Sequence, residues 1–185
     1  MKRSFPLLLV LLLVCASLVK VNAQISADEI KTQLVKDWER AKAYTNDYLT
    51  TMPADKYRAR AVDSIRSFSE QMLHLATGTI GLVANGTGAT RIFPGFNMEK
   101  SVGAQTKDSV TYYVNASYDF AINSIKNMDA SKLMDHVVRG PYDETKLAWI
   151  MKAFEHQTHH RGQCTIYIRL QGIRPPNEQL LIPKS

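Results

Sequence analysis

Three of the five histidines in the chain, His156, His159 and His160, lie in one short segment. His156 and His160 are four residues apart. If the segment is helical, residues at this spacing lie on the same face, with Cβ atoms roughly 5–6 Å apart. Imidazole nitrogens are common ligands of divalent metals, so this pair can bind one ion together. The segment is therefore the first candidate for a chemical site.

A metal site built from neutral imidazoles usually has three or more protein ligands, and a catalytic site also keeps a position open for water or substrate. The third ligand must then come from another part of the chain. The two histidines outside the segment are His74 and His136. His74 falls in a predicted helix, which holds a ligand more rigidly than the predicted loop that carries His136.

Other interpretations of the histidine segment stay open. Two histidines at this spacing are more often solvated or hydrogen-bonded than bound to a metal. In the zincin motif a glutamate general base follows the first histidine, whereas here Gln157 follows His156 and Glu155 precedes it, which argues against a metalloprotease. Cys164, four residues beyond His160, is either a fourth ligand or, as is more common, a small buried apolar residue.

The periodicity around His74 does not place this residue in the core. His74 falls nearly opposite the apolar stripe of its predicted helix, on the face that carries Glu70, Gly78 and Gly81. Spacing alone therefore favours an exposed histidine. The alternative is that the two glycines leave open space beside a ligand. The stripe that should face the core consists of Phe68, Met72, Leu75, Ala76, Thr79, Leu82 and Val83.

Helical periodicity and capping signals predict four helices. Ser26 and Glu29 form a capping box before the first helix, and Ser67 and Glu70 form another before the second. Gly172 follows the last helix, and the two prolines beyond it prevent its continuation. With no repeat and no alternating strand pattern, the fold class is all-α, a four-helix bundle. The predicted helices span about 27–50, 67–85, 106–128 and 143–171, with long loops at 86–105 and 129–141.

The beginning of the chain has the pattern of a secretory signal peptide. Lys2 and Arg3 precede an apolar run at 7–14, and small residues precede Gln24. The run is shorter than the roughly 20 apolar residues of a membrane-spanning helix. We therefore expect cleavage before Gln24. The alternatives are an uncleaved membrane anchor and a lipid attached at Cys15.

Cleavage would leave residues 24–185 as one exported domain, periplasmic or secreted, with no stable membrane insertion. Its 162 residues suit a single domain with a substantial core. Because residues 1–23 hold three basic residues and no acidic ones, the net charge falls from +6 to +3. No concentrated basic surface remains that would argue for a nucleic-acid partner. Cys164 is the only cysteine left, so no internal disulfide can form.

Three blocks of the sequence resemble the DinB/YfiT-like family. The blocks are Arg66–Ala76, His156–Gln163 and Leu170–Pro176. The resemblance covers essentially the whole chain after the predicted signal and implies a four-helix bundle, often dimeric. One histidine of the second helix and the two outer histidines of the fourth-helix motif bind a divalent metal in this family. These correspond to His74, His156 and His160, which leaves His159 as a neighbour of the metal site.

The resemblance implies a divalent-metal-dependent enzyme of the thiol transferase or hydrolase type that acts on a small-molecule substrate. Three neutral histidines leave the charge of the ion uncompensated, so the ion can lower the pKa of a bound water or of a substrate thiol. Imidazole ligands do not select among Zn, Ni and Fe. Glu70, one turn before His74, and Glu155, beside His156, are candidate general bases.

Two other functions remain open on the sequence. The first is an exported, non-enzymatic bundle that binds a metal or a small ligand, and the second is a structural bundle with a vestigial site. The characterised members of the resembling family transfer low-molecular-weight thiols in the cytosol, so the predicted export signal leaves the substrate open. The resemblance also leads us to expect a homodimer.

Overall fold

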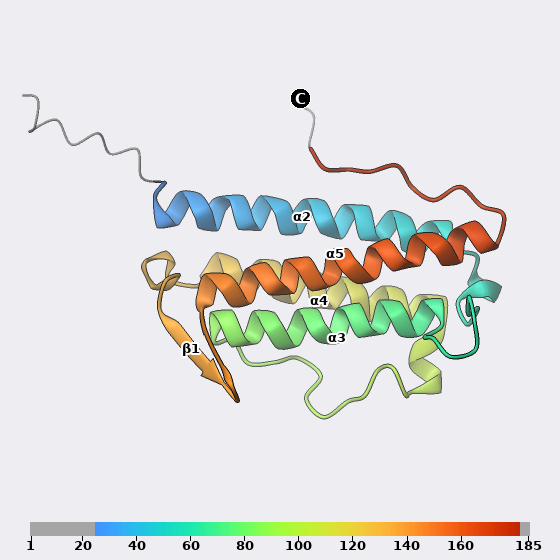
Figure 1. The fold of residues 1–185 in the computed structure, drawn as a ribbon, viewed down its shortest axis with the longest axis horizontal. Helices are drawn as coiled ribbons and strands as arrows, with labels where there is room; N and C mark the ends of the chain where they lie inside the picture. The colour runs from blue at the N-terminus through green and yellow to red at the C-terminus, as the bar shows by residue number, and fades with distance from the viewer. Residues whose placement is uncertain (1–24, 182–185) are drawn as a thin grey trace, which may run out of the picture.

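Four long helices form the fold, and they run side by side as a bundle (Figure 1). The structure is a computed structural model that describes residues 25–181. It confirms the predicted all-α four-helix bundle. The helices are α2 (Ala27–Thr51), α3 (Phe68–Thr87), α4 (Lys107–Asn127) and α5 (Lys146–Leu170), and short 3-10 turns lie at Ala54–Lys56, Val102–Gln105 and Ala130–Lys132. The predicted signal peptide, residues 1–23, lies outside the described residues.

The capping residues begin the helices where the sequence predicts. In both predicted capping boxes the serine side chain accepts from the backbone N–H of the glutamate, and the glutamate carboxylate accepts from the serine backbone N–H. Thr106 caps α4 in the simpler way, by accepting from the Ser109 backbone N–H. These caps satisfy N–H groups that have no partner inside the helix.

The predicted start of the last helix is wrong, because a small β-hairpin precedes this helix. Strands β1 (His136–Arg139) and β2 (Tyr142–Thr145) pair antiparallel, and Gly140 adopts a positive φ of 57° in the turn between them. The chain therefore contains two strands that the sequence analysis did not predict, and α5 begins at Lys146 and not near residue 143. Each strand has only four residues and is largely exposed, so neither shows a buried alternating face.

Helix α3 packs along both α4 and α5, and α2 packs on the same two helices; in Figure 1, α5 runs between α2 and α3, with α4 behind. The core between the helices contains fully buried Trp38, Phe68, Tyr118 and Ile150. Because α3 contacts two neighbours, its buried sector also takes in Leu73 and is wider than the predicted stripe. One edge of this buried face of α3 lies against α5.

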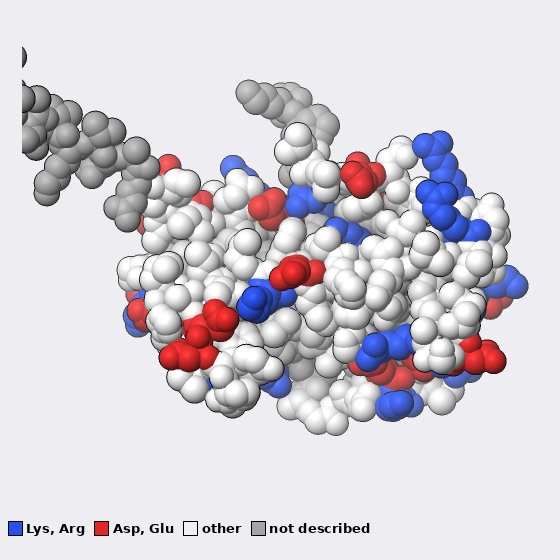
Figure 2. Space-filling model, viewed as in Figure 1, with Lys and Arg blue, Asp and Glu red and all other residues white. Residues whose placement is uncertain are grey.

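The surface carries interspersed charges. On the face that Figure 2 shows, acidic and basic side chains alternate and no single sign dominates. Among the described residues, no helix is both long and apolar enough to cross a membrane. After α5 the chain turns at Gly172, whose φ is 72°, and the segment that follows returns along α2, where Arg40 Nη1 donates to the Gln179 carbonyl oxygen at 2.8 Å.

Candidate metal centre

The structure brings together the three histidines that the family resemblance indicates. His74 comes from α3, and His156 and His160 come from α5. One nitrogen from each ring lies within 4.8 Å of the nitrogens from the other two. The ring centroids are 5.2 Å apart for His74 and His156, 4.5 Å for His74 and His160, and 4.4 Å for His156 and His160. Helical spacing supplies one pair, and the packing of α3 against α5 supplies the third ring.

His74 is partly buried, with 27% of its side chain exposed. The wheel-based expectation of an exposed histidine is wrong because the buried sector of α3 is wider than its apolar stripe, and His74 lies at the margin of this sector, against α5. Gly78, one helical turn after His74, allows the His156 ring to lie close to α3. A Cβ at Gly78 would lie 2.1 Å from Cε1 of His156, closer than any real contact. The His156 ring therefore occupies the space that a side chain at Gly78 would fill.

Glu99, from the connection between α3 and α4, orients His74. Its Oε1 lies 2.7 Å from Nδ1 of His74, and its Oε2 accepts from Nε of Arg66 at 2.8 Å. A carboxylate can only accept, so Nδ1 of His74 carries the hydrogen and the lone pair of Nε2 stays free. Burial raises the pKa of Glu99, but the hydrogen bonds from Arg66 and His74 outweigh it and hold the pKa below its usual value.

Gln163 has the same role for His160. Its Oε1 lies 3.0 Å from Nδ1 of His160 and also accepts from the side chain of Gln71 on α3. A carbonyl oxygen can only accept, so the Nε2 lone pair of His160 is free as well. His156 differs, because its Nδ1 is buried without a hydrogen-bond partner. A buried nitrogen in this state costs free energy unless a ligand or water satisfies it.

The environment keeps two of the three imidazoles neutral. Burial, and secondarily the nearby histidines, lowers the pKa of His156 and of His160 to about 4. Near neutral pH each of these rings is therefore uncharged, with one N–H and one nitrogen lone pair that can bind a metal. Neutral, converging imidazoles with one buried unpartnered nitrogen form a donor set that fits a divalent metal such as Zn, Ni or Fe. These observations support the candidate ligands without identifying an ion.

The other candidate residues are not part of the three-histidine cluster, although the His159 ring lies 4.9 Å from that of His160. His136 is exposed on β1, with Nδ1 2.8 Å from Oδ1 of Asp143. His159 is exposed and accepts from Gln163 Nε2 at 3.0 Å, within its own helix. Cys164 is fully buried in the core, and burial raises the pKa of its thiol, so the apolar role is the correct one.

The two candidate general bases also differ in position. Glu70 lies near the cluster, but its Oε2 accepts from the Ser67 backbone N–H and pairs with Arg60 at 2.7 Å. Burial raises the pKa of Glu70, and these partners outweigh it, so the net shift is downward. This carboxylate is held as a helix cap. Glu155 is exposed on a different surface of α5, beside Lys152.

A polar pocket of about 700 Å³ adjoins the cluster on the side of His160. Three cationic side chains and two carboxylates face it, so the pocket has a net positive charge. No spacing signal links Glu99, a loop carboxylate, to a helix histidine. Gln163 is three residues after His160 on the same helix, and this spacing is a signal that could have indicated its role. The lining residues are Arg60, Ser64, Ile65, Arg66, Glu70, Gln71, Glu99, Lys100, His159, His160 and Gln163.

Two crystal structures of DinB-like proteins share this fold. The protein from Bacillus cereus ATCC 10987 superposes with a TM-score of 0.68 at 16% identity, over 79% of this chain and 95% of that one. The protein from Bacillus subtilis has a TM-score of 0.64 at 18% identity, over 78% of this chain and 96% of that one. No curated protein matches the chain. The model of the DinB family matches residues 26–183, and the chain therefore belongs to the DinB family.

Proposed function

We propose that His74, His156 and His160 bind one divalent metal ion and that the chain is a metal-dependent enzyme of the thiol transferase or hydrolase type. The observation that carries the proposal is the convergence of three imidazoles, two held neutral by burial, on a site where Nδ1 of His156 has no partner. When bound, the ion supplies a positive charge that lowers the pKa of a water or thiol and so creates a nucleophile near neutral pH.

The chain's own residues prepare the site for this chemistry. Glu99 and Gln163 fix the orientations of His74 and His160, and such partners of metal ligands typically matter about 10–100-fold for metal affinity. The adjoining pocket gives a small-molecule substrate access to the cluster. Arg60 and Arg66 are paired with Glu70 and Glu99 at this pocket, so the charge of Lys100 gives it a net positive charge that favours an anionic substrate.

A non-enzymatic, exported bundle that binds a metal or a small ligand is the second candidate. The pocket beside His160 favours the enzyme, because a site built only for storage does not need a large polar opening next to one ligand. Export with cleavage before Gln24, and a homodimer, belong to the proposal on the strength of the sequence. N-terminal sequencing of the protein from its native host and light scattering of the purified protein test these two points.

Metal content tests the site. Protein purified without an affinity tag should carry near-stoichiometric Zn, Ni or Fe by elemental mass spectrometry, and His160→Ala and His74→Ala should lose most of it. His136→Ala is the matched control and should keep the metal, because His136 lies on the exposed hairpin. If His74→Ala retains as much metal as the wild type, the ligand set is wrong.

Catalysis needs a separate measurement. A panel of thiol-conjugation and ester- and amide-hydrolysis reactions, run with and without a chelator, should reveal an activity that the chelator removes and added metal restores. An activity that persists without the metal would contradict the mechanism. Metal binding without any activity across the panel would favour the non-enzymatic bundle.

A further inference from the structure

Aromatic side chains pack the connection between α3 and α4 against α4. The ring centroids of Phe93 and Tyr113 are 5.2 Å apart, and those of Phe96 and Tyr113 are 5.5 Å apart. Phe93 has a positive φ of 55°, which residues other than glycine rarely adopt. The packing of Phe93 therefore holds a strained turn in place. These contacts hold the connection against α4.

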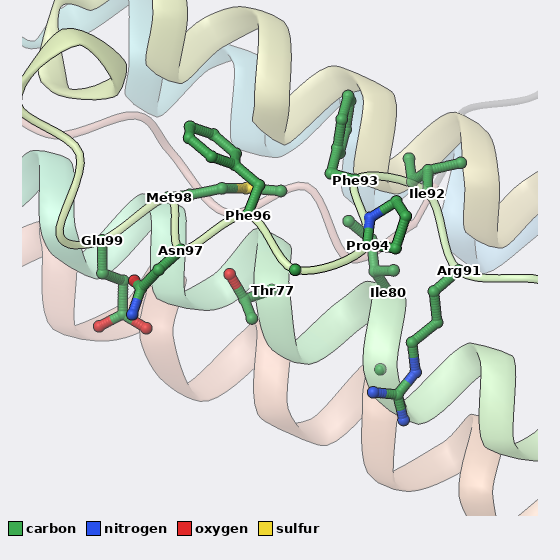
Figure 3. Close-up of a pocket in the computed structure, with 12 residues that line it drawn as sticks. Thr77, Ile80, Arg91, Ile92, Phe93, Pro94, Phe96, Asn97, Met98 and Glu99 are labelled. Atoms are coloured by element: carbon green, nitrogen blue, oxygen red, sulfur yellow. The ribbon is translucent and has the colours of Figure 1, made fainter.

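A cavity of about 330 Å³ lies between this connection and α3 (Figure 3), and we call it the loop cavity. Thr77, Ile80 and Gly81 of α3 form one wall, and residues 91–99 form the other. A Cβ at Gly81 would meet no atom within 4 Å, so this glycine leaves open space on the α3 wall. The volume is at the lower end of the roughly 300–1,000 Å³ that small-molecule sites occupy.

The loop cavity has apolar residues along its middle, with Thr77 and Asn97 among them, and a charged residue at each end. Figure 3 shows Arg91 at one end and Glu99 at the other. Ile80, Ile92, Pro94 and Met98 line it, together with the backbone near Phe93 and Phe96, whose rings point away from α3 and pack on Tyr113 (Figure 3). An occupant must therefore have an apolar body, and the two ends decide which charge it can carry.

The two charged ends are not equivalent. Both oxygens of Glu99 are engaged, one with His74 and one with Arg66, so the negative end is already neutralised. Arg91 is exposed, and Nη2 donates to the neutral amide of Asn85 at 3.2 Å. Its positive charge is thus available to an anion, and a carboxylate is the partner that a guanidinium binds best.

We infer that the loop cavity binds a small organic acid, with its apolar body between α3 and the loop and its carboxylate on Arg91. The site is distinct from the polar pocket beside His160, although Glu99 lines both. A bound acid would therefore lie against the same residue that orients His74. Binding itself needs no metal, so it can be tested independently of the proposed function.

The test is a pair of titrations of the metal-free protein, with octanoate and with octylammonium, followed by backbone amide shifts in NMR spectra. The two probes have the same chain length and opposite charge. Octanoate should shift the amides of residues 77–81 and 91–99 in a saturable way, and octylammonium should leave them unchanged. Octanoate shifts confined to other parts of the chain, or equal binding of both probes, would overturn the inference.

Two glycines provide a matched pair of filling variants. Gly81 lines the loop cavity, whereas Gly103 lines a separate pocket, and a Cβ at either position meets no atom within 4 Å. Gly81→Leu should abolish octanoate binding at concentrations that saturate the wild type, and Gly103→Leu should leave it intact. Equal binding by the two variants would show that the acid does not occupy the loop cavity.

Arg91→Gln tests the anion contact without filling the cavity. Arg91 is exposed, so this variant should fold like the wild type. Loss of one exposed ion pair should weaken octanoate about fivefold. Unchanged octanoate affinity would rule out the contact between the carboxylate and Arg91.

Discussion

Two faces of α5 carry polar side chains, and their hydrogen bonding differs. Toward α3, His156 and His160 converge with His74, and Nδ1 of His156 has no partner. On another face, Gln157 is fully buried and all its polar atoms are used. Its Oε1 accepts from the Tyr118 hydroxyl at 2.7 Å and from Arg161 Nη1 at 3.0 Å, and its Nε2 donates to Thr158 Oγ1 at 2.7 Å.

One helix, α5, thus carries a structural cluster on one face and the proposed metal site on another. Arg161 is buried over the ring of Tyr44, 4.4 Å from its centroid, and completes a network that links α5 to α2 and α4. No fully buried side-chain nitrogen or oxygen of Gln157 or Arg161 lacks a partner, so this network stabilises the bundle from within. The histidine cluster has unused lone pairs, which is the state expected of a site that receives an ion.

Among single substitutions, the largest expected effect on stability comes from breaking the hydrogen-bond network of Gln157. Gln157→Leu removes the acceptor of the Tyr118 hydroxyl and of the Arg161 guanidinium, and leaves a buried charged group short of a partner. The free energy of unfolding should fall by about 2–3 kcal/mol. Urea unfolding of the metal-free protein measures this loss, and metal content should stay at the wild-type level.

The same substitution on an exposed surface is the control for Gln157→Leu. Gln33 lies on the outside of α2, and Gln33→Leu should change stability by no more than about 0.5 kcal/mol. If Gln157→Leu instead lost the metal at unchanged stability, the division of α5 into a structural face and a ligand face would be wrong.

The next effect concerns the ligand face alone. Gly78→Ala places a Cβ 2.1 Å from Cε1 of His156, so the imidazole must move. Zinc affinity, measured by competition with a chelator, should fall about 10–100-fold, the range seen when a ligand loses its orienting contacts. Gly81→Ala, on the same helix with open space at its Cβ, should keep the affinity and add about 0.5–1 kcal/mol of stability. Similar affinities for both variants would contradict the role of Gly78.

A smaller effect should follow from Glu99→Gln. The amide can still accept from Nδ1 of His74, but its negative charge is lost, so zinc affinity should fall about tenfold. Glu39→Gln is the control, because Glu39 pairs with Lys126 on an exposed surface. An equal response of the two variants would mean that Glu99 does not support the metal ligand.

Lowering the pH should reduce the stability of the metal-free protein gradually. His156 and His160 have pKa values of about 4 in the folded chain and about 6.5 when unfolded, so the unfolded state binds more protons between these values. Above about pH 6.5 these two groups do not lower the free energy of unfolding of the metal-free protein. As the pH drops from about 6.5 toward 4, this free energy falls. Urea midpoints at several pH values measure this slope. A His156→Gln, His160→Gln double variant should flatten it, and an unchanged slope would contradict the neutral, buried state.

Several features of the fold could be predicted because they depend on neighbours in the sequence. The capping boxes at Ser26 and Ser67 act within one helical turn, and the glycine and prolines after α5 act on the local backbone. The hairpin at 136–145 was missed because its strands are short and largely exposed, so no buried side alternates along them.

The sequence by itself determined that His156 and His160 share a face, because helix geometry fixes the relation of residues four apart. Family resemblance, and not periodicity, indicated His74. Only the tertiary structure decided that a partly buried His74 meets this pair. It also decided that Gly78 makes room for the His156 ring and that Glu99 orients His74. These relations join α3, α5 and the loop before α4, and such contacts follow from how helices pack, which no local sequence pattern encodes.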